Sequence, residues 1–384
     1  MSRRRAVVVG AGIGGLTAAV ALHRRGWEVV VYERSRQPSP GAGIVLAPNA
    51  LRALDSIGVG VERATGGAVP AAMGIRRPDG GWLGRAESAE LTARYGCPPL
   101  AVHRAALVRG LAAELPPGVL RYGVAVHGVE DAKDAPLVRA DDGELRADAV
   151  VAADGINSAL RRRYFPGHPG LRYSGESAWR TVVSAEGLPA LTASETWGRG
   201  QRFGVVPLAD GRVYAYATAH VPQGTRPADA RAELARRFAG WHAPVPALLE
   251  RLDPASLLQH DLFDLAAPLP RLHHGRLAWI GDAAHAMTPN LGQGGCQAVE
   301  DAVVLAHLLG RSGPDGVPDA LAAYCAARRE RTDAIRVRAR RAGRLAGLRH
   351  PLAAGARNLA LRTVPARFTL RALDDLYEGF SLPA

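Results

Sequence analysis

The sequence predicts a mixed α/β fold in which a parallel-sheet domain is interleaved with a mostly antiparallel sheet and followed by C-terminal helices. Three observations support this prediction. A continuous apolar run precedes a glycine-rich turn near the N-terminus, and the middle of the chain carries alternating, aromatic-rich segments. After Glu300 the pattern is almost wholly helical. Apolar runs typify strands buried on both faces, whereas alternation typifies half-buried strands.

The first glycine-rich segment has the pattern of a strand, a turn and a helix. Residues 6–9 are apolar, Gly10-x-Gly12-x-x-Gly15 follows, and residues 16–22 continue in a helical Ala/Leu pattern. In such a turn the first glycine allows the tight bend, the second lets the backbone approach a pyrophosphate, and the third lets helix and strand pack closely. The helix N-terminus then offers free N–H groups to the phosphates.

A second predicted strand, residues 28–32, ends at Glu33. An acidic side chain about twenty residues after the first glycine is where the adenosine ribose of a bound dinucleotide is expected. Strand, helix, second strand and terminal glutamate therefore predict dinucleotide binding. The alternative is a tight turn that binds nothing.

A second glycine-rich segment lies far along the chain. The apolar strand 277–280 ends at Gly281-Asp282, and the glycine-rich loop 292–295 opens another helix. An enzyme that uses only a nicotinamide cofactor needs the first segment alone. An enzyme that wraps a long flavin dinucleotide between two distant segments needs both, so the pair favours FAD.

The order of these patterns predicts interleaved domains. We expect one helix from Ala50 to Ile57 with Asn49 as its N-cap, strands and loops from Met73 to Pro99, and one helix near 227–238 within the second sheet. The predicted FAD-binding domain comprises residues 1–72, 100–170 and 271–325, the substrate-binding sheet domain comprises 73–99 and 171–270, and the C-terminal helical segment comprises 326–384.

Composition narrows the class of protein. With 47% apolar and 22% charged residues, the 384-residue chain is globular. It has no long uncharged apolar stretch, so we expect no membrane span. The basic residues 3–5 lead into the glycine turn and not into a cleavable apolar region. The three cysteines follow no metal-ligand pattern. We therefore expect a cytoplasmic protein without a metal site.

The net charge of +12 raises the question of nucleic-acid binding. Lys133 is the only lysine among the 48 basic residues, and the arginines are scattered, except over 328–349 where helical spacing gathers them. No aromatic residues interleave with them, so we expect no nucleic-acid partner. The arginine-rich stretch is either a solvated helix face or a patch for an anionic surface or a partner.

Together these motifs resemble a known family. Gly10-x-Gly12-x-x-Gly15 with Glu33, then Asp154-Gly155, then Gly281-Asp282 with Pro289-x-x-Gly292-Gln293-Gly294, is similar to the single-component FAD aromatic hydroxylases, the group A flavoprotein monooxygenases built like para-hydroxybenzoate hydroxylase. The resemblance runs from Val7 to about Arg340.

The resemblance implies bound FAD and a transient NADPH or NADH, for which the sequence has no second GxGxxG motif. It implies that the glycine turn contacts the diphosphate, Arg104 the ribityl–phosphate region, the Val126 backbone the adenine, and Asp282 the ribityl hydroxyls. The implied FAD-contacting set is Gly10, Gly12, Ile13, Gly14, Gly15, Glu33, Arg34, Val45, Arg104, Val126, Asp154, Asp282, Gly292, Gln293, Gly294, Gly295 and Cys296.

The implied reaction uses O2 and a flavin C4a-hydroperoxide to add one oxygen atom to an aromatic or heteroaromatic small molecule. Similarity to flavin-dependent urate hydroxylases implies that Arg202 and Tyr214 face the substrate, beside Pro289 and Asn290. Those enzymes carry an aspartate where this chain has Asn290, so we expect a substrate other than urate. Arg180 could also line the pocket, although a salt-bridged sheet arginine is the alternative.

Other functions remain open at this point. The same scaffold serves epoxidases, N-hydroxylases and decarboxylative hydroxylases, and a flavin reductase without oxygenation is a more distant alternative. A flavin-bearing chaperone is disfavoured, because it would not need the whole flavin cradle. Either a monomer or a homodimer fits the sequence.

Overall fold

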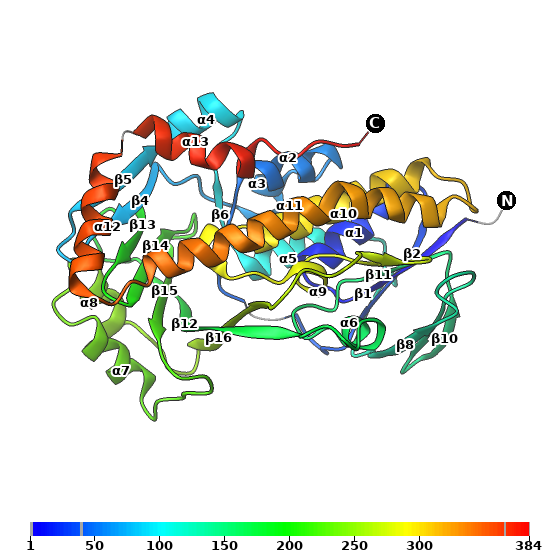
Figure 1. The fold of residues 1–384 in the computed structure, drawn as a ribbon, viewed down its shortest axis with the longest axis horizontal. Coiled ribbons are helices and arrows are strands. Elements are labelled where there is room, and N and C mark those ends of the chain that lie inside the picture. Colours follow the sequence, from blue (N-terminus) through cyan, green and yellow to red (C-terminus); the bar gives the residue numbers. More distant parts are fainter. Residues whose placement is uncertain (1–2, 39–40, 365, 384) are drawn as a thin grey trace.

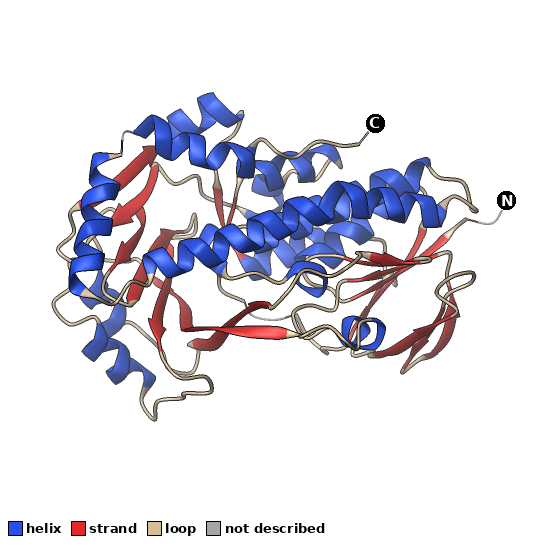
Figure 2. Ribbon diagram, viewed as in Figure 1, coloured by secondary structure: helices blue, strands red, loops and turns tan. Residues whose placement is uncertain are grey.

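The computed structural model describes residues 3–38, 41–364 and 366–383 (Figure 1). It confirms the mixed α/β fold. A mostly parallel sheet lies near the N-terminus and a larger, mostly antiparallel sheet lies at the opposite end of the molecule (Figure 1). Long helices run between these two ends (Figure 2).

The first sheet has six strands in the order β17-β18-β11-β1-β2-β7. Its strands are β1 (Arg5–Val9), β2 (Glu28–Glu33), β7 (Leu120–Tyr122), β11 (Ala149–Ala152), β17 (His273–His274) and β18 (Leu277–Trp279). All neighbouring pairs are parallel except β17–β18. Val7, Val8 and Val150 are fully buried in its centre, as expected for a parallel sheet covered on both faces.

Two helices that begin at the glycine-rich segments lie side by side against this sheet. They are α1 (Ile13–His23) and α10 (Gly294–Arg311). Helix α5 (Arg104–Ala113) packs beside α1. The apolar faces of α1 and α10 are almost completely buried in the same hydrophobic core as β1 and β11.

The second sheet has seven strands in the order β16-β12-β15-β14-β13-β4-β5. Its strands are β4 (Ala72–Arg76), β5 (Trp82–Glu87), β12 (Leu171–Ser184), β13 (Ala193–Trp197), β14 (Gln201–Pro207), β15 (Arg212–His220) and β16 (Leu258–Leu265). Neighbours are antiparallel except β13–β4.

The two faces of the second sheet differ in character. On one face Trp179 and Phe203 pack with Phe238 in a core that includes residues of α7 (Ala230–Arg237) and α8 (Val245–Glu250). The other face carries the alternate residues of the same strands, because successive side chains in a strand point to opposite sides. Arg180 and Tyr214 lie on that second face.

Smaller elements complete the fold. A three-stranded sheet contains β8 (Val126–Glu130), β9 (Leu137–Ala140) and β10 (Gly143–Arg146), and a two-stranded sheet contains β3 (Gly43–Leu46) and β6 (Leu100–His103). The short helices are α2 (Pro48–Ser56), α3 (Val61–Thr65), α4 (Ser88–Tyr95), α6 (Ala159–Tyr164), α9 (Asp282–His285) and the 3₁₀ helix η1 (Pro289–Leu291).

The C-terminal part is helical, as predicted. Helix α11 (Val317–Ala346) runs along α10, and α12 (Pro351–Thr363) and α13 (Ala366–Tyr377) follow it (Figure 2). Tyr324 on α11 donates a hydrogen bond to the Trp279 carbonyl at the end of β18, which ties this part to the first sheet. Among the helices in the described ranges, none is long and apolar enough to cross a bilayer.

Three local predictions were wrong. Asn49 is not an N-cap: helix α2 already begins at Pro48, and Asn49 is buried inside it. The region 73–99 contains helix α4, which begins with a capping box between Glu87 and Glu90. A further helix, α8, lies within the second sheet region. The domain boundaries given above remain predictions.

Candidate functional site: two glycine-rich segments at one helix junction

The two glycine-rich segments meet in the folded chain. A Cβ atom built on Gly14 of α1 would lie 3.1 Å from the Cβ of Ala298 on α10, and one built on Gly281 would lie 2.9 Å from that same atom. A Cβ on Gly295 would lie 4.0 Å from Ile13 Cδ1. The absence of side chains at these glycines therefore lets the N-terminal ends of α1 and α10 come together. We call this meeting point of the two glycine-rich segments the glycine junction.

The β1–α1 turn leaves room for a ligand at one glycine only. A Cβ on Gly10, whose φ is +106°, would lie 2.4 Å from the Ala153 carbonyl oxygen, and one on Gly15 would lie 1.9 Å from the Gly10 oxygen. A Cβ on Gly12 would meet no described atom within 4 Å. Gly12 is also the N-cap of α1 and offers no side-chain cap, so the first N–H groups of the helix are available to an anion.

Glu33 lies directly beside this turn. Its Oε2 accepts a hydrogen bond of 2.8 Å from the Ala11 N–H, and its Oε1 accepts one of 2.9 Å from the Ser35 N–H. The carboxylate therefore fixes the glycine loop. Each carboxylate oxygen keeps a lone pair that can accept a hydrogen bond from a ribose hydroxyl. That contact remains a prediction.

The second segment presents a carboxylate next to an uncapped helix. Asp282 is exposed at the start of α9, and its Oδ1 lies 4.0 Å from a Cβ built on Gly294. Helix α10 begins after Gln293 without a side-chain cap, so its first N–H groups are also available. Gly292 has a φ of +63°, and a Cβ there would enter open space. This loop and Asp282 thus border one surface.

A buried ionic cluster lies beneath that surface. Asp301 Oδ2 accepts a 2.9 Å hydrogen bond from the Gly281 N–H and contacts His285 Nε2 at 2.5 Å, while Asp301 Oδ1 accepts from Arg328 Nε at 2.7 Å. Burial would raise the pKa of Asp301, but His285 and Arg328 outweigh burial and hold this pKa at about 2. Asp301 therefore fixes the backbone immediately before Asp282, and His285 is a hydrogen-bonding residue.

The cluster continues to α2. Glu300 pairs with Arg328 and Arg331, and its Oε1 accepts a 2.6 Å hydrogen bond from Asn49 Nδ2. Asn49 also donates to Gln293 Oε1 at 3.0 Å. The buried amides of Asn49 and Gln297 therefore fix the position of the Gln293 side chain. Burial would raise the pKa of Glu300, yet Arg328 and Arg331 keep it below its usual value.

The remaining predicted cofactor residues lie in different settings. Asp154 Oδ2 accepts from the Leu160 N–H, whereas its Oδ1 is buried without a partner among the described residues. Arg104, the first residue of α5, is exposed, and a Cβ on Gly41 would lie 3.1 Å from its Cβ. Arg34 is exposed after β2, and Val126 lies half-buried in β8. No described contact joins Val126 to the glycine junction.

Cys296 is a packing residue in this structure. Its thiol is completely buried in the first turn of α10, where Sγ accepts a 3.5 Å contact from the Ala47 N–H. Burial raises the pKa of the Cys296 thiol to about 12. The thiol is therefore protonated at neutral pH, and any contact with a cofactor would come from its backbone.

Arg202 is enclosed by polar partners. It is 2% exposed and donates to Glu176 Oε2 at 2.9 Å and to Asn290 Oδ1 at 2.7 Å, with Glu195 3.6 Å away. Burial would lower the pKa of Arg202, but Glu195 and Glu176 outweigh burial and raise it. The structure thus joins two predicted residues, Arg202 and Asn290, and neutralises the arginine with protein carboxylates. Pro289 precedes Asn290 in η1.

Tyr214 contacts the loop that leads to the glycine junction. A Cβ on Gly43 of β3 would lie 2.3 Å from Tyr214 Cγ, and the Tyr214 and Tyr216 ring centroids are 5.4 Å apart. The two tyrosines therefore share a face, because residues two apart in a strand point to the same side. Burial raises the Tyr214 pKa, although Arg180 hydrogen-bonds its hydroxyl and partly opposes this shift. Tyr214 is consequently a neutral hydrogen-bonding group near pH 7.

Several residues at this site were missed by sequence reasoning. Asn49, Glu300, Asp301 and Arg328 form the supporting cluster, and Glu176 and Glu195 surround Arg202. The adjacent acids Glu300 and Asp301 in a mostly apolar helix were the available signal. Nothing in the local sequence indicates which partners Glu176 and Glu195 select.

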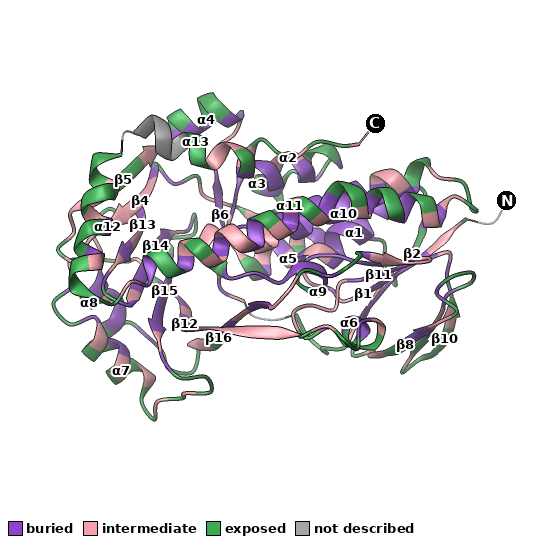
Figure 3. Ribbon diagram, viewed as in Figure 1, coloured by how far each residue is buried: buried purple, intermediate pink, exposed green. Residues whose placement is uncertain are grey.

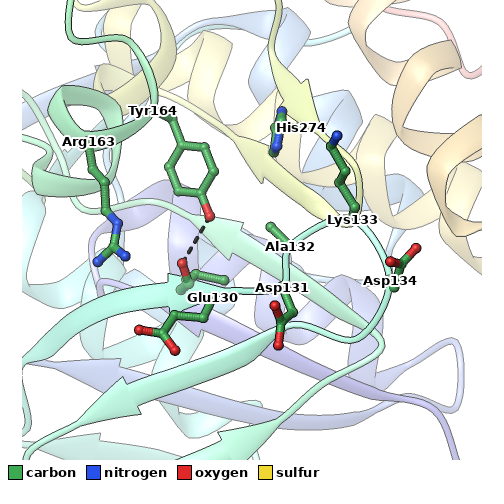
Figure 4. A pocket seen from close by; sticks show the side chains of 9 residues that line it. Glu130, Asp131, Ala132, Lys133, Asp134, Arg163, Tyr164 and His274 are labelled. Atoms are coloured by element: carbon green, nitrogen blue, oxygen red, sulfur yellow. Dashed lines mark hydrogen bonds between the residues drawn. The ribbon is translucent and has the colours of Figure 1, made fainter.

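A hollow of about 590 Å³ lies elsewhere, between β8, α6 and β17 (Figure 4). In it Tyr164 donates a hydrogen bond to the Val129 carbonyl, and Arg163, Lys133 and Glu130 surround the opening. Its walls include neither glycine-rich segment. We therefore place the candidate site at the glycine junction and not in this open, mixed-charge hollow.

The junction fits a flavin dinucleotide. It combines two uncapped helix N-termini for phosphate and carbonyl oxygens with open space over Gly12 and Gly292. The exposed carboxylate of Asp282 and the unpartnered Asp154 Oδ1 can accept hydrogen bonds from ribose or ribityl hydroxyls. These features define an FAD-binding protein.

The comparisons with known proteins agree. The family model described as "FAD binding domain" matches residues 3–339, and the chain belongs to this family. It is 41% identical to aurachin C monooxygenase/isomerase of Stigmatella aurantiaca over 85% of each chain. It is 36% identical to the FAD-dependent urate hydroxylase of Klebsiella pneumoniae, covering 86% of this chain and 87% of that one.

Solved structures give the same result. The structure of Klebsiella pneumoniae HpxO complexed with FAD and uric acid has a TM-score of 0.91 and 32% identity, and the match covers 99% of this chain and 98% of that one. The protein is therefore a flavoprotein monooxygenase of the group A type, and FAD is its cofactor.

The open position of Gly12 yields a prediction. Gly12→Ala should preserve the melting temperature, because the new Cβ meets no described atom. It should weaken FAD binding by about tenfold or more, because the backbone can no longer approach the pyrophosphate closely. Fluorescence titration of the apoprotein with FAD measures this change.

Gly15→Ala is the contrasting variant and should lose about 1–3 kcal/mol of stability through overpacking. Equal FAD affinity in Gly12→Ala and wild type would contradict the placement.

The Asp301 cluster yields a second prediction. Asp301→Asn should lower the free energy of unfolding by about 3 kcal/mol at pH 7, because Arg328 loses a buried partner. The folded-state pKa of Asp301 is depressed to about 2, so its contribution is present above the unfolded value of about 4 and is lost as pH falls towards 2. The difference between wild type and variant should therefore shrink across this range.

Urea denaturation at pH 7 and pH 3 measures that difference. Asp315→Asn, a change of an exposed aspartate in the loop before α11, is the matched control and should leave stability unchanged at both pH values. A wild-type advantage that stays constant down to pH 2 would show that the ionised Asp301 does not provide the stabilisation.

Proposed function

We propose that this protein uses NADPH or NADH and O2 to hydroxylate an aromatic or heteroaromatic small molecule. The observation that carries the proposal is the position of β3. Gly43 of β3 packs on Tyr214 of the second sheet, and the next residue, Ile44, has its Cδ1 2.9 Å from a Cβ built on Gly295. One short strand thus links the polar, aromatic sheet face to the loop proposed to contact the flavin.

The N-terminal ends of α1 and α10 and the Asp282 carboxylate would hold FAD, which would supply the hydride-accepting and oxygen-activating chemistry. The protein's part would be to orient the ring and exclude water. Apolar side chains suited to this task surround Tyr214: Ala42, Val206 and Leu208 are buried there, with Val45, Val182 and Leu258 partly buried around them. Such a surface favours a flat, largely apolar substrate.

Arg180 is the cation on this face that is free to meet a substrate. It is half-buried, hydrogen-bonds Tyr214, and forms no ion pair with any carboxylate in the described part of the chain. Arg202, in contrast, already has Glu176 and Asn290 as partners. We therefore assign substrate-anion binding to Arg180, with Tyr214 as a hydrogen-bond donor, and a supporting role to Arg202.

The relatives narrow the substrate class. One is named a urate hydroxylase, another acts on aurachin C, and a third is named 2-heptyl-3-hydroxy-4(1H)-quinolone synthase. Urate and the quinolone are nitrogen heterocycles with oxygen substituents on the ring. The neutral Asn290 side chain beside Arg202 disfavours urate, so we propose a less polar heteroaromatic or phenolic substrate with one acidic oxygen.

The test is NAD(P)H oxidation by the FAD-loaded protein with hydroxybenzoates, hydroxypyridines, quinolones and purines, while peroxide and products are quantified. A compound that accelerates oxidation and gains one oxygen atom is the expected result. Incorporation of ¹⁸O from ¹⁸O2 identifies the source of that atom. Faster oxidation that yields peroxide alone with every compound would contradict hydroxylation and favour a non-oxygenating flavin reductase.

Arg180 gives a specific kinetic prediction. Arg180→Gln should raise KM for an acidic substrate by about tenfold or more, because a charge-assisted hydrogen bond is lost. KM for a matched neutral O-methyl derivative should change little. Arg212→Gln is the control, since Arg212 is an exposed arginine on the same strand as Tyr214 and pairs with Asp210. An equal change for both substrates would contradict anion binding by Arg180.

A further inference from the structure

Helix α12 lies on the outer edge of the molecule, beside β5 and far from the first sheet (Figure 1). Its buried residues are Ala354 and Arg357. Arg357 is 5% exposed and donates hydrogen bonds to the carbonyls of Ala346, at 2.6 Å, and Gly198, at 3.2 Å. Its guanidinium also lies 5.3 Å from the centre of the Trp197 ring. An arginine and the small Ala354 thus attach this helix to the fold.

The outward face is apolar instead. Leu352 and Leu359, seven positions apart and so on one side of the helix, are 79% and 64% exposed. Leu345 at the end of α11 and Val364 after α12 are 45% and 42% exposed. Figure 3 shows this helix as largely exposed along its length. Helix α12 is therefore inverted relative to an ordinary surface helix: Arg357 is inside, whereas Leu352 and Leu359 are outside.

Along the sequence, the charge around α12 has one sign. Between Asp333 and Asp374 the chain has ten arginines and no acidic residue. Several of these arginines are engaged by carboxylates, as Arg340 is by Asp264. Others are exposed and form no ion pair in the part of the chain that the structure describes; these are Arg341, Arg344, Arg349 and Arg362. Exposed leucines thus lie among uncompensated cations, and we call Leu345, Leu352, Leu359, Val364 and these four arginines the α12 surface.

We propose that the α12 surface docks on an anionic lipid bilayer. Exposed leucines with flanking arginines are what an interfacial helix needs, since the apolar side chains enter the acyl boundary and the cations meet acidic headgroups. A second copy of this chain fits less well. A two-fold interface would place the same patch against itself, and these arginines would face one another without acidic partners.

The test uses the FAD-loaded protein and sedimentation with vesicles of phosphatidylcholine alone or with 30% phosphatidylglycerol. The protein should bind the anionic vesicles, bind them less at high salt, and leave the neutral vesicles largely unbound. Arg344→Glu with Arg362→Glu should lower the vesicle partition coefficient at least about tenfold. Leu352→Ser with Leu359→Ser should lower it by a similar factor.

Matched control variants test whether vesicle binding depends on the α12 surface itself and not on the overall charge or hydrophobicity of the protein. Arg63→Glu with Arg109→Glu makes the same change in net charge at exposed positions on α3 and α5. Val69→Ser with Leu382→Ser removes two exposed apolar side chains elsewhere. Both should bind vesicles like the wild type. FAD content and the melting temperature should be unchanged in all four variants, because none of the substituted residues touches the glycine junction.

Three results would overturn the proposal. They are equal binding to neutral and anionic vesicles, no binding to either, and equal loss of binding in the α12 variants and their controls. A concentration-dependent dimer that only Leu352→Ser with Leu359→Ser dissociates in analytical ultracentrifugation, without vesicle binding, would identify a second copy as the occupant. Retention by an acidic protein without vesicle binding would likewise exclude the bilayer.

Discussion

The close packing of α1 on α10 is the constraint on which the rest of the structure depends. It is possible because Gly14 and Gly281 have no side chains where Ala298 approaches. Each helix N-terminus carries a partial positive charge of about half an elementary charge, and uncapped ends leave N–H groups unsatisfied. Bringing two such ends together is unfavourable unless a ligand rich in oxygen atoms binds them. The junction therefore favours a dinucleotide whose pyrophosphate meets one helix N-terminus and whose ring carbonyls meet the other.

The buried ionic cluster supports this junction from the opposite side. Asp301 fixes the Gly281 backbone, and Glu300 joins α10 to Arg328 on α11 and Asn49 on α2. Buried ion pairs often add little net stability, but removing one partner is costly. In this position they fix the relative placement of three helices. Asp282 and the Gly292 loop consequently occupy defined positions even though both are exposed to the ligand space.

Much of this could be predicted from the sequence because the motifs are local. The β1–α1–β2 unit, the turn glycines and the carboxylate of Asp282 follow from short patterns whose physical requirements are strict. Long-range partners could not be predicted in this way. Asparagine is a residue type typical of N-caps. The burial of Asn49 against Glu300 depends instead on how α2 packs on α10. Arg202 has the sequence context of a substrate arginine, yet Glu176, twenty-six positions away, engages it. A helical C-terminal segment was predicted, but the inverted orientation of α12 was not, because only packing reveals that Arg357 is inside.

The most direct test of the account is hydrogen–deuterium exchange of the apoprotein with and without FAD, read at the two glycine-rich segments. One ligand that spans both helix ends should slow exchange together at residues 11–16 and 293–297, with the largest change at the first N–H groups of α1 and α10. Residues 352–362 on α12 should not respond. Protection confined to residues 11–16 would contradict the account, because it would describe a dinucleotide held by the first segment alone.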